Sequence, residues 1–473
     1  MNMKRTKIYP ALLLLALGAV SPRNAEAKVN DLLPYPHVVN QKQGSFLLNR
    51  SVQLNDATGN KALRQFLADN GCTTSNDADA KVSVTITDNI KGAHDYTLAG
   101  FDNEAYTLDI TDNAISIKAV TAIGVTRAVQ TLTQLAEGYD DGAAPELELV
   151  SITDWPAFKL RGWMQDVGRS FLSVEELKKE IRLLSRFKVN VFHWHLTEKL
   201  AWRFQVNAYP ELTADRNMTR YPGKFYTQAE CREIEEYAAE HGITVIPEID
   251  MPGHSDVFTQ AMGFDMQSTQ GRTALKKILD EVATTFTRAP YIHIGGDEVS
   301  IQAGFLEEMA GYVRNTLHRK VLLWNPLMNK GITSGIADMT QMWSANGKLV
   351  SGMPNIDCRY NYINHFDVYA DLVGIYKSNI YYAQQGSEEI AGTITATWND
   401  TKTETETDII RQNNQYANIL ASAERAWKGG GKQYIEQGGT TLPNSGEEYD
   451  EFADFERRFL FHKAHSLKEA PIP

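Results

Sequence analysis

The stretch Tyr-Ile-His-Ile-Gly-Gly-Asp-Glu, at residues 291–298, joins a short apolar run to two glycines and two adjacent carboxylates. The run at 291–294 predicts a short buried strand, and the glycines release the backbone immediately before Asp297 and Glu298. Adjacent acids in a partly dry site repel each other, so one is driven toward its protonated form while the other stays ionised. This arrangement suits the cleavage of a glycosidic bond. Considered in isolation, however, such a pair is more often an ordinary solvated strand end, so the rest of the chain has to decide.

Residues 158–445 alternate predicted strands with predicted helices. Strands are expected at 158–167, 189–192, 243–250 and 291–294, and further short strands are expected to begin at Val321, Met339, Ile356 and Gly392. Two of the helices open with capping boxes, Ser173 with Glu176 and Thr227 with Glu230. One long helix is expected at about 404–427, and none is evident immediately before the last strand. The alternation predicts an α/β fold, a (β/α)8 TIM barrel.

A small α+β domain is predicted at residues 28–157, before the barrel. It contains an alternating strand at 81–86, a hairpin at 106–117 and a helix whose apolar positions, from Val125 to Leu135, share one face. No catalytic cluster is evident in this unit, so we interpret it as structural support. Residues 446–473 are expected to form an acidic loop and a C-terminal helix with a short tail.

Residues 1–27 have the features of a secretory signal peptide. A basic start, from Lys4 to Lys7, precedes an apolar run at 11–20, and Ala25-Glu26-Ala27 supplies small residues for a cleavage site. The apolar run is about half as long as a membrane-spanning helix, and no later stretch is long enough, so no membrane insertion is expected. The protein is therefore expected to be exported, to the periplasm or to the outside of the cell.

Bulk properties place weak limits on partners. The chain of 473 residues is 42% hydrophobic and has a net charge of −12, which argues against nucleic acid as a partner. Its three cysteines are odd in number and far apart, so no disulfide framework is expected. Nothing in the sequence indicates a particular oligomeric state.

Polar and aromatic side chains lie at or near the ends of the predicted strands. Because the carboxyl ends of barrel strands meet at one face, where active sites are built, we expect these side chains to converge. The group comprises Arg161, Asp166, His193, His195, Glu198, Glu248, Asp250, His254, Asp297, Glu298, Trp324, Trp343, Tyr362 and Trp398. Aromatic walls with a few polar groups suit a pyranose ring, which has apolar faces and hydroxyls.

His193 and His195 leave a second hypothesis open. Two histidines at i and i+2 of a strand share a face, and with His254 and Asp297 they could hold a metal, as in a barrel-type metallohydrolase. We favour packing or a supporting role, because the pair lies on the second strand and no candidate for a carbamylated lysine is evident. We therefore expect neither a metal nor a cofactor.

Four of these segments together resemble the family 20 glycoside hydrolases, the β-N-acetylhexosaminidases. The matching segments are Asp154–Asp166, Asn190–Thr197, Pro247–His254 and His293–Glu298, the last being the most specific. The resemblance covers nearly all of the chain after the signal peptide, including the small domain before the barrel. It implies exo-acting hydrolysis of a terminal non-reducing β-linked GlcNAc or GalNAc in a glycan or chitooligosaccharide. It also implies a retaining, substrate-assisted reaction, in which the sugar's own 2-acetamido oxygen attacks the anomeric carbon.

The resemblance implies catalytic roles for several of these residues. Glu298 would protonate the leaving oxygen and then deprotonate water, while Asp297 would hold and orient the acetamido group. Tyr362 would donate a hydrogen bond to the acetamido oxygen, and His254 would help to position Glu298. The residues expected to support these groups without touching the sugar are Glu198 and His195.

Further residues are expected, by the same resemblance, to contact the sugar ring. They are Arg161 at the C3 and C4 hydroxyls, Trp324, Trp343 and Trp398 as walls, and Asn364 and Asp400 at the C4 and C6 hydroxyls. Three positions depart from the family pattern, because Glu198-Lys199 replaces two aspartates, Asn364 replaces Asp and Asp400 replaces Glu. The preference between GlcNAc and GalNAc therefore stays open. A third hypothesis, a GlcNAc-binding protein without catalysis, rests on these changes, and the presence of both acids weighs against it.

Overall fold

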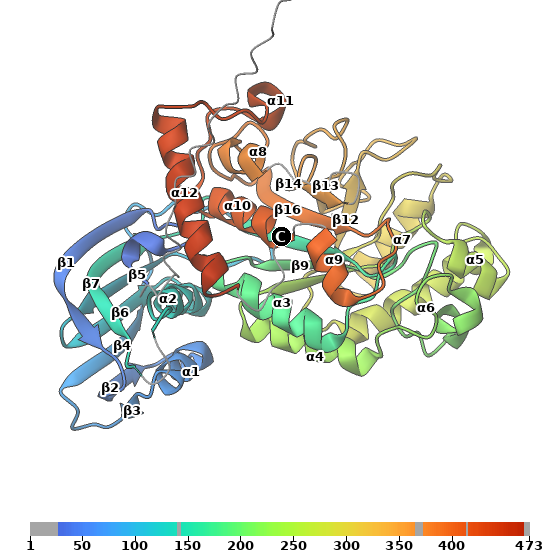
Figure 1. The fold of residues 1–473 in the computed structure, drawn as a ribbon. Helices are drawn as coiled ribbons and strands as arrows, with labels where there is room; N and C mark the ends of the chain where they lie inside the picture. The colour runs from blue at the N-terminus through green and yellow to red at the C-terminus, as the bar shows by residue number, and fades with distance from the viewer. Residues whose placement is uncertain (1–26, 140–142, 365–371, 413–414, 468–473) are drawn as a thin grey trace, which may run out of the picture.

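Two sheets of different kinds organise the molecule (Figure 1). The computed structural model describes residues 27–139, 143–364, 372–412 and 415–467. The predicted signal peptide lies outside this part except for Ala27, which is buried and donates its backbone N–H to the Glu137 carbonyl at 3.0 Å. Among the described residues, no helix combines the length and apolar character needed to cross a membrane.

The N-terminal domain packs two helices against one face of a mixed sheet. The strand order is β1-β7-β5-β6-β4-β2-β3. The strands are β1 (Val38–Leu47), β2 (Ser51–Asp56), β3 (Thr73–Thr74), β4 (Ala80–Ile86), β5 (Tyr106–Thr111), β6 (Ala114–Ala119) and β7 (Glu146–Asp154), and the helices are α1 (Lys61–Asp69) and α2 (Ala122–Leu135). The predicted hairpin is confirmed as the antiparallel pair β5–β6, in which the alternate residues Leu108 and Ile117 face the buried side.

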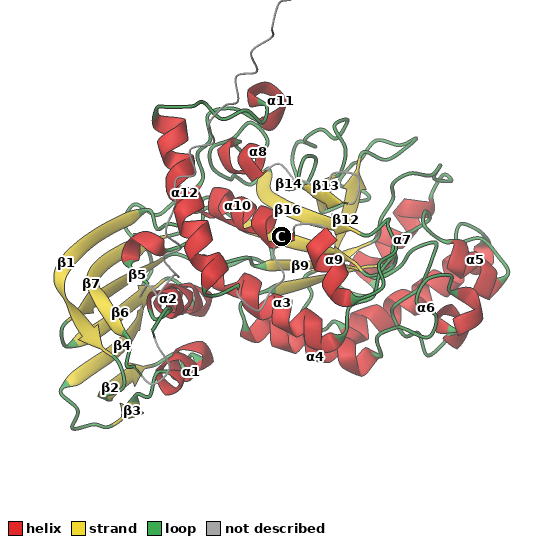
Figure 2. Cartoon of the chain, viewed as in Figure 1, coloured by secondary structure: helices red, strands yellow, loops and turns green. Residues whose placement is uncertain are grey.

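The second sheet is a parallel barrel with eight strand positions, and Figure 2 shows the helices around it. The strands are β8 (Leu160–Asp166), β9 (Val191–His195), β10 (Thr244–Glu248), β11 (Tyr291–His293), β12 (Lys320–Asn325), β13 (Met339–Met342), β14 (Asn355–Asp357), β15 (Tyr362–Asn364) and β16 (Ile390–Trp398). The seventh position is divided, because β14 pairs with the first half of β16 and β15 with its end. The TIM-barrel prediction is confirmed, and the broken seventh strand is a feature that the sequence pattern does not predict.

Helices accompany the barrel unevenly. They are α3 (Val174–Arg186), α4 (Gln228–Glu240), α5 (Asp256–Met262), α6 (Thr269–Thr285), α7 (Phe305–Asn315), α8 (Leu372–Lys377), α9 (Glu406–Gln412), α10 (Gln415–Lys428), α11 (Ile435–Gly438) and α12 (Glu447–Ala464). The described loops 326–338 and 343–354, after β12 and β13, contain no helix. The helix expected at 404–427 corresponds to α9 and α10, between which residues 413–414 lie outside the described chain, and α8 precedes β16 where no helix was evident.

Both predicted capping boxes fall at helix starts. Ser173 Oγ accepts the Glu176 backbone N–H at 3.3 Å at the start of α3. Thr227 and Glu230 bond reciprocally at the start of α4, which satisfies two backbone donors that the helix leaves free. These caps fix the points at which the chain leaves the carboxyl-end loops and returns along the outside of the barrel.

The register of the parallel strands brings polar residues to one level. Asp166 of β8 pairs with His195 of β9, His195 with Glu248 of β10, and Glu248 with His293 of β11. Because parallel strands end together, the segments that follow them emerge at the same face of the barrel. This face carries the acids at residues 297 and 298.

Candidate active site

Asp297 and Glu298 follow β11 through a turn that only glycine allows. Gly295 and Gly296 have φ of +66° and +106°, the left-handed range that side chains disfavour. A Cβ on Gly295 would lie 1.7 Å from Asp250 Oδ1, so the carboxylate of the neighbouring strand occupies the space of the missing side chain. The turn buries Asp297 to 7% exposure and leaves the Glu298 side chain 53% exposed.

Asp297 is a buried acid with a free oxygen. Within the described residues, Asp297 Oδ1 and both carboxylate oxygens of Asp250 have no hydrogen-bond partner. Burial, followed by the charge of Asp250, raises the pKa of Asp297 well above its usual range. Burial likewise raises the pKa of Asp250 to about 6. The pair is short of positive charge and of hydrogen-bond donors.

Glu298 belongs to a relay of three side chains. His254 Nε2 lies 3.1 Å from Glu298 Oε2, and His254 Nδ1 lies 2.9 Å from Glu198 Oε1. Burial disfavours the imidazolium, but the neighbouring carboxylates of Glu198 and Glu298 outweigh it and raise the pKa of His254 to about 12. The hydrogen bond from His254 lowers the pKa of Glu298. Both His254 and Glu298 have positive φ, +48° and +56°, a strained backbone that is common at functional sites.

The pKa values of the two acids are therefore shifted in opposite directions, as the sequence predicts, and the structure indicates which acid is shifted which way. Asp297 is favoured to hold a proton and Glu298 to be ionised. The proton donor expected from the family resemblance is Glu298. A ligand that offers a donor to Asp297 and covers Glu298 would exchange these preferences, because donors favour a carboxylate and burial favours a neutral acid.

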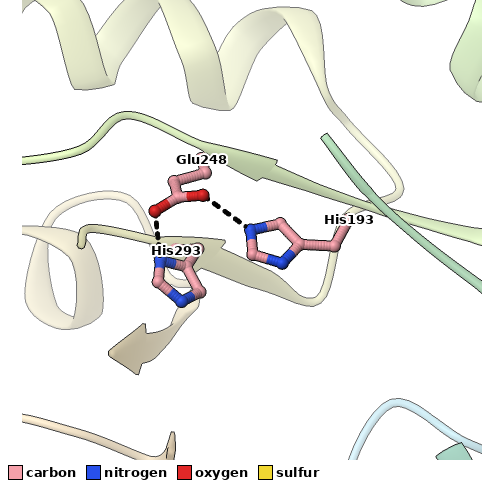
Figure 3. Close-up of side chains that lie close together, drawn as sticks. All are labelled: His193, Glu248 and His293. Carbon is pink, nitrogen blue, oxygen red and sulfur yellow. Dashed lines mark hydrogen bonds and ion pairs between the residues drawn. The ribbon is translucent and has the colours of Figure 1, made fainter. Parts of the chain in front are cut away.

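Glu248 is the centre of the barrel interior, as Figure 3 shows with two of its partners. Its carboxylate accepts hydrogen bonds from His193 Nε2 at 2.8 Å and His195 Nδ1 at 2.6 Å, and His293 Nδ1 lies 3.2 Å away. Trp324 Nε1–H donates to its other oxygen at 2.7 Å. Burial opposes the charge, but these imidazoles hold the pKa of Glu248 well below its usual range. His193 and His195 thus orient a buried carboxylate, as the packing interpretation of this pair predicts.

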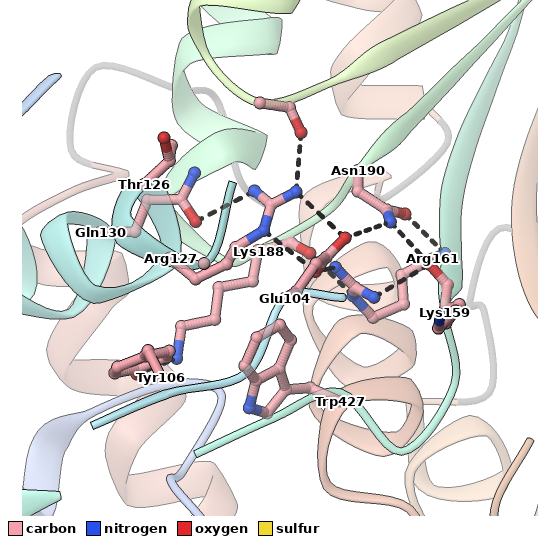
Figure 4. Close-up of polar contacts among 12 residues, drawn as sticks. Glu104, Tyr106, Thr126, Arg127, Gln130, Lys159, Arg161, Lys188, Asn190 and Trp427 are labelled. Carbon is pink, nitrogen blue, oxygen red and sulfur yellow. Dashed lines mark hydrogen bonds and ion pairs between the residues drawn. The ribbon is translucent and has the colours of Figure 1, made fainter. Parts of the chain in front are cut away.

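Arg161 is not near the acids, and its expected sugar contact is wrong. It is the second residue of β8, at the opposite end of the barrel, and is 1% exposed. Figure 4 shows its guanidinium among buried groups where the domains meet, including Glu104 and Asn190. It forms an ion pair with Glu104 and donates to the carbonyls of Lys188, Phe158 and Lys159.

Arg169, which the sequence reasoning missed, lies at the active face instead. Its guanidinium contacts Asp166 at 3.0 Å, Glu198 at 2.5 Å and Asp400 at 3.1 Å, and stands 5.1 Å from the Trp398 ring centroid. It follows the end of β8 by three residues. The rule that active-site groups follow carboxyl strand ends would have selected it.

Aromatic rings line the interior beside these acids. Trp398 lies 5.9 Å from Trp324, 5.6 Å from Tyr362 and 5.0 Å from His195, measured between ring centroids. Trp324 is fully buried, whereas Trp343, whose Nε1–H donates to the Pro326 carbonyl at 2.9 Å, is partly exposed. Their placement agrees with a walled pocket, and their contacts with a sugar stay a prediction.

Asn364 and Asp400 are two of the three positions that depart from the family pattern. Asn364 lies at the end of β15, and its side chain is outside the described part of the chain. Asp400 follows β16 and its carboxylate bonds to Arg169, which brings it to the expected side of the site.

Two groups among the described residues are close enough to hold a metal ion: His193 with Glu248 and His293, and Asp250 with His254 and Asp297. In the first group the imidazoles already contact the carboxylate, and the side chains are fully buried. In the second group both oxygens of Asp250 and Oδ1 of Asp297 have no hydrogen-bond partner among the described residues.

Comparison with known proteins gives a consistent result. The family model described as glycosyl hydrolase family 20, domain 2, matches residues 30–155, and the model of the catalytic domain of that family matches residues 158–276. A beta-hexosaminidase of Porphyromonas gingivalis is 33% identical over 328 residues, 60% of this chain and 42% of that protein. A beta-N-acetylhexosaminidase of Cellulomonas fimi is 32% identical over 274 residues, 52% of this chain and 54% of that protein. The chain thus spans about half the length of these relatives.

The fold is shared over a longer stretch. The crystal structure of a beta-N-acetylhexosaminidase from Bacteroides fragilis superposes with a TM-score of 0.75 at 26% sequence identity. The superposition covers 92% of this chain and 96% of that chain, so the N-terminal domain and the barrel are both included.

Proposed function

Because the chain belongs to glycosyl hydrolase family 20, we propose that it is an exo-acting β-N-acetylhexosaminidase. The proposed substrate is a terminal non-reducing β-linked N-acetylglucosamine or N-acetylgalactosamine of a glycan or chitooligosaccharide. One observation carries the proposal. A buried acid with a free oxygen, Asp297, directly precedes a half-exposed acid, Glu298, that is bonded to a histidine.

The proposed reaction uses the substrate as its own nucleophile. Two neighbouring residues of one strand end cannot easily stand on opposite faces of a sugar ring, as an acid and a protein nucleophile must. The acetamido oxygen instead attacks the anomeric carbon and forms an oxazolinium ion, while Glu298 protonates the leaving oxygen. Water then attacks the anomeric carbon and opens the oxazolinium ring, while Glu298 takes a proton from this water. The anomeric configuration is therefore retained.

Asp297 and the relay behind Glu298 steer these steps. The free Oδ1 of Asp297 accepts the acetamido N–H, which favours the carboxylate and stabilises the positive charge of the intermediate. Covering Glu298 with the sugar removes solvent from it and favours the protonated acid. His254, held by Glu198, fixes the direction of the Glu298 carboxyl.

The test compares two chromogenic glycosides with the purified protein at pH 4–8. We expect release from the β-N-acetylglucosaminide and little from the β-glucoside, which lacks the internal nucleophile. Equal turnover of the two would reject the substrate-assisted reaction, and release from neither would reject the activity. The same assay separates the metallohydrolase hypothesis, which requires that a chelator abolish activity and that zinc restore it.

A pair of substitutions tests the two acid roles. In Glu298→Gln the general acid is lost, so activity should fall by about 10²–10⁴-fold on poor leaving groups and far less on activated aryl glycosides. In Asp297→Asn the acetamido group loses its anionic partner, so activity should fall on both types of substrate. A fully active Asp297→Asn variant would contradict the role given to Asp297.

We further propose that the protein is exported to the periplasm or to the outside of the cell. The basic start, the apolar run at 11–20 and the small residues at 25–27 support this. Fractionation of the native cells, followed by N-terminal sequencing, tests it. A cytosolic protein that retains Met1 would contradict the proposal.

A further inference from the structure

Three side chains converge on a point next to Glu298: Asp250, two residues after β10, His254, four residues later, and Asp297, after β11. Their donor atoms all lie within 4.8 Å of one another, and Asp250 Oδ2 is 3.9 Å from His254 Nε2. We propose that Asp250, His254 and Asp297 bind a divalent transition-metal ion such as Zn²⁺, and that the bound ion inhibits the enzyme.

The charge around this point favours a cation. Asp250 is 1% exposed, and neither of its oxygens has a hydrogen-bond partner among the described residues. Asp297 Oδ1 is also buried without a partner. Buried carboxylates without donors are costly, and His254 is the one cation that contacts this pair within the described chain. A metal ion would supply the missing positive charge and bind the free oxygens directly.

The donor set suits zinc better than magnesium or calcium. One imidazole and two carboxylates form the three-ligand pattern of an open zinc site, with a fourth position left for water. Glu198, 2.9 Å from His254 Nδ1, leaves Nε2 on the side of the ring where Glu298 lies 3.1 Å away and Asp250 lies 3.9 Å away. A carboxylate behind a ligating histidine is the usual support of such a ligand. Ligands of tetrahedral zinc lie about 3.4 Å apart, so the side chains need to close by roughly 1 Å.

The second group of potential ligands makes a useful contrast. In the group of His193, Glu248 and His293 both carboxylate oxygens already have partners, one at 2.8 Å from His193 and the other at 3.2 Å from His293. All three side chains are also fully buried. In the group beside the acids an ion would displace His254 from Glu298, but both oxygens of Asp250 and Oδ1 of Asp297 have no hydrogen-bond partner among the described residues. The free oxygens therefore single out the group beside the acids.

Inhibition follows from the overlap of this metal site with the proposed catalytic groups, and to that extent rests on the proposed function. The ion would occupy the Asp297 oxygen that accepts the acetamido N–H. It would also replace the proton on His254 Nε2, which is released to solvent, and so break the contact of this nitrogen with Glu298. Zinc and substrate would then exclude each other. A metallohydrolase would show the opposite response, because it gains activity from zinc.

Metal binding is measured first, without any assay of activity. Purified protein is stripped with EDTA, desalted and titrated with ZnCl₂ by calorimetry and with CoCl₂ by visible absorption. We expect one ion per chain, with weakening by about tenfold or more in Asp250→Asn and in His254→Gln. The matched controls are Asp256→Asn and His318→Gln, exposed residues outside the group, which should bind like the unaltered protein. Circular dichroism verifies that each variant is folded.

The outcomes are distinct. Absence of a bound ion, or binding that is equal in all four folded variants, overturns the site. If both ligand variants fail to fold, the cobalt spectrum of the unaltered protein provides the test. A cobalt ion bound at the surface lacks the intense absorption bands of a tetrahedral site. The absence of these bands would therefore also overturn the proposal. N-acetylglucosamine should displace the ion and glucose should not. Site-specific binding without hexosaminidase activity would leave the metal site standing and reject the proposed function alone.

Discussion

Arg169 connects three carboxylates of the active face through one guanidinium. Its partners Asp166, Glu198 and Asp400 come from three different strand ends. A planar cation with several fixed donors is well suited to neighbouring sugar hydroxyls. We expect Arg169→Met to lower kcat/KM by about 10²–10³-fold, because the variant loses two charge-assisted hydrogen bonds to the sugar.

Steady-state kinetics with a chromogenic β-N-acetylglucosaminide measures this effect. Arg216→Met is the matched control, because Arg216 is an exposed arginine that pairs with Glu211, and each of the two lies in a short 3₁₀ helix. An unchanged kcat/KM in the Arg169 variant would remove this residue from sugar recognition.

The two arginines also show what the sequence can and cannot supply. Arg161 lies within one predicted strand and Arg169 lies just after it, and the sequence reasoning chose Arg161 from its motif. The direction of a barrel strand decides between them, because only its carboxyl end faces the active side. Arg161 is the second residue of β8, and Arg169 follows the strand. Asp297, Glu298 and His254 could be identified because they follow their strands, whereas the hydrogen bonds of His193 and His195 to Glu248 depend on how β9 pairs with β10.

At the scale of elements, Arg220 clamps three of the loops that build the site. Its guanidinium donates to the backbone carbonyls of Arg169, Asn399 and Asp400, at 3.2, 2.8 and 2.5 Å. It does not reach the acids, so its effect passes through Arg169 and Asp400. In Arg220→Gln we expect KM to rise more than kcat falls, because recognition of the sugar loosens while the acids stay in place.

Kinetics on the intact protein checks this split, and Arg220→Lys should recover part of the loss. A fall in kcat of the variant without any change in KM would contradict a positioning role for Arg220.

Helix α3 carries a buried acid, Glu180, against α10. Burial, followed by the charge of Glu176, raises the pKa of Glu180 well above its usual range. The folded state thus keeps a proton that the unfolded chain releases above about pH 4.5, and stability falls as pH rises, by up to about 1.4 kcal/mol per pH unit until the folded pKa is reached. Glu180→Gln removes this dependence. Its stability relative to the unaltered protein should therefore be greater at pH 8 than at pH 5.

Urea unfolding at the two pH values measures this difference. Glu175→Gln, an exposed acid on the same helix, is the control and should show no such change with pH. A pH-independent effect of Glu180→Gln would mean that the acid is ionised in the folded protein.

Local patterns predict some elements better than others. The capping motifs at Ser173 and Thr227 each span four residues, so the starts of α3 and α4 follow from the sequence, although only Thr227 and Glu230 form the reciprocal box. The division of the seventh strand into β14 and β15 depends on how each half pairs with β16. No periodicity in residues 355–364 records those partners, which are more than 30 residues away.

At the scale of the whole molecule, buried charges join the two domains. Glu104 of the N-terminal domain accepts hydrogen bonds from Arg127 Nε at 3.0 Å and from Asn190 Nδ2 at 2.9 Å. It also forms an ion pair with Arg161 of the barrel (Figure 4). The C-terminal helix α12 adds a second connection, since Arg458 reaches the Leu32 carbonyl at 3.1 Å and Glu424 of α10 at 2.8 Å. The small domain therefore supports the barrel from the end opposite the acids.

Removing the Glu104 charge should destabilise the protein without altering its chemistry. Burial opposes ionisation, but Arg127 and Arg161 lower the pKa of Glu104, so its stabilisation is complete above the unfolded pKa and is lost as pH falls through the folded value. At neutral pH, Glu104→Gln leaves two buried guanidinium groups uncompensated and should cost about 3–5 kcal/mol. Asp109→Asn, which breaks an exposed pair with Lys42, should cost under about 1 kcal/mol. Thermal unfolding measures the loss of stability in both variants, and kcat at 25 °C should stay unchanged in each. Equal losses of stability in the two variants would show that the domains are held by apolar packing alone.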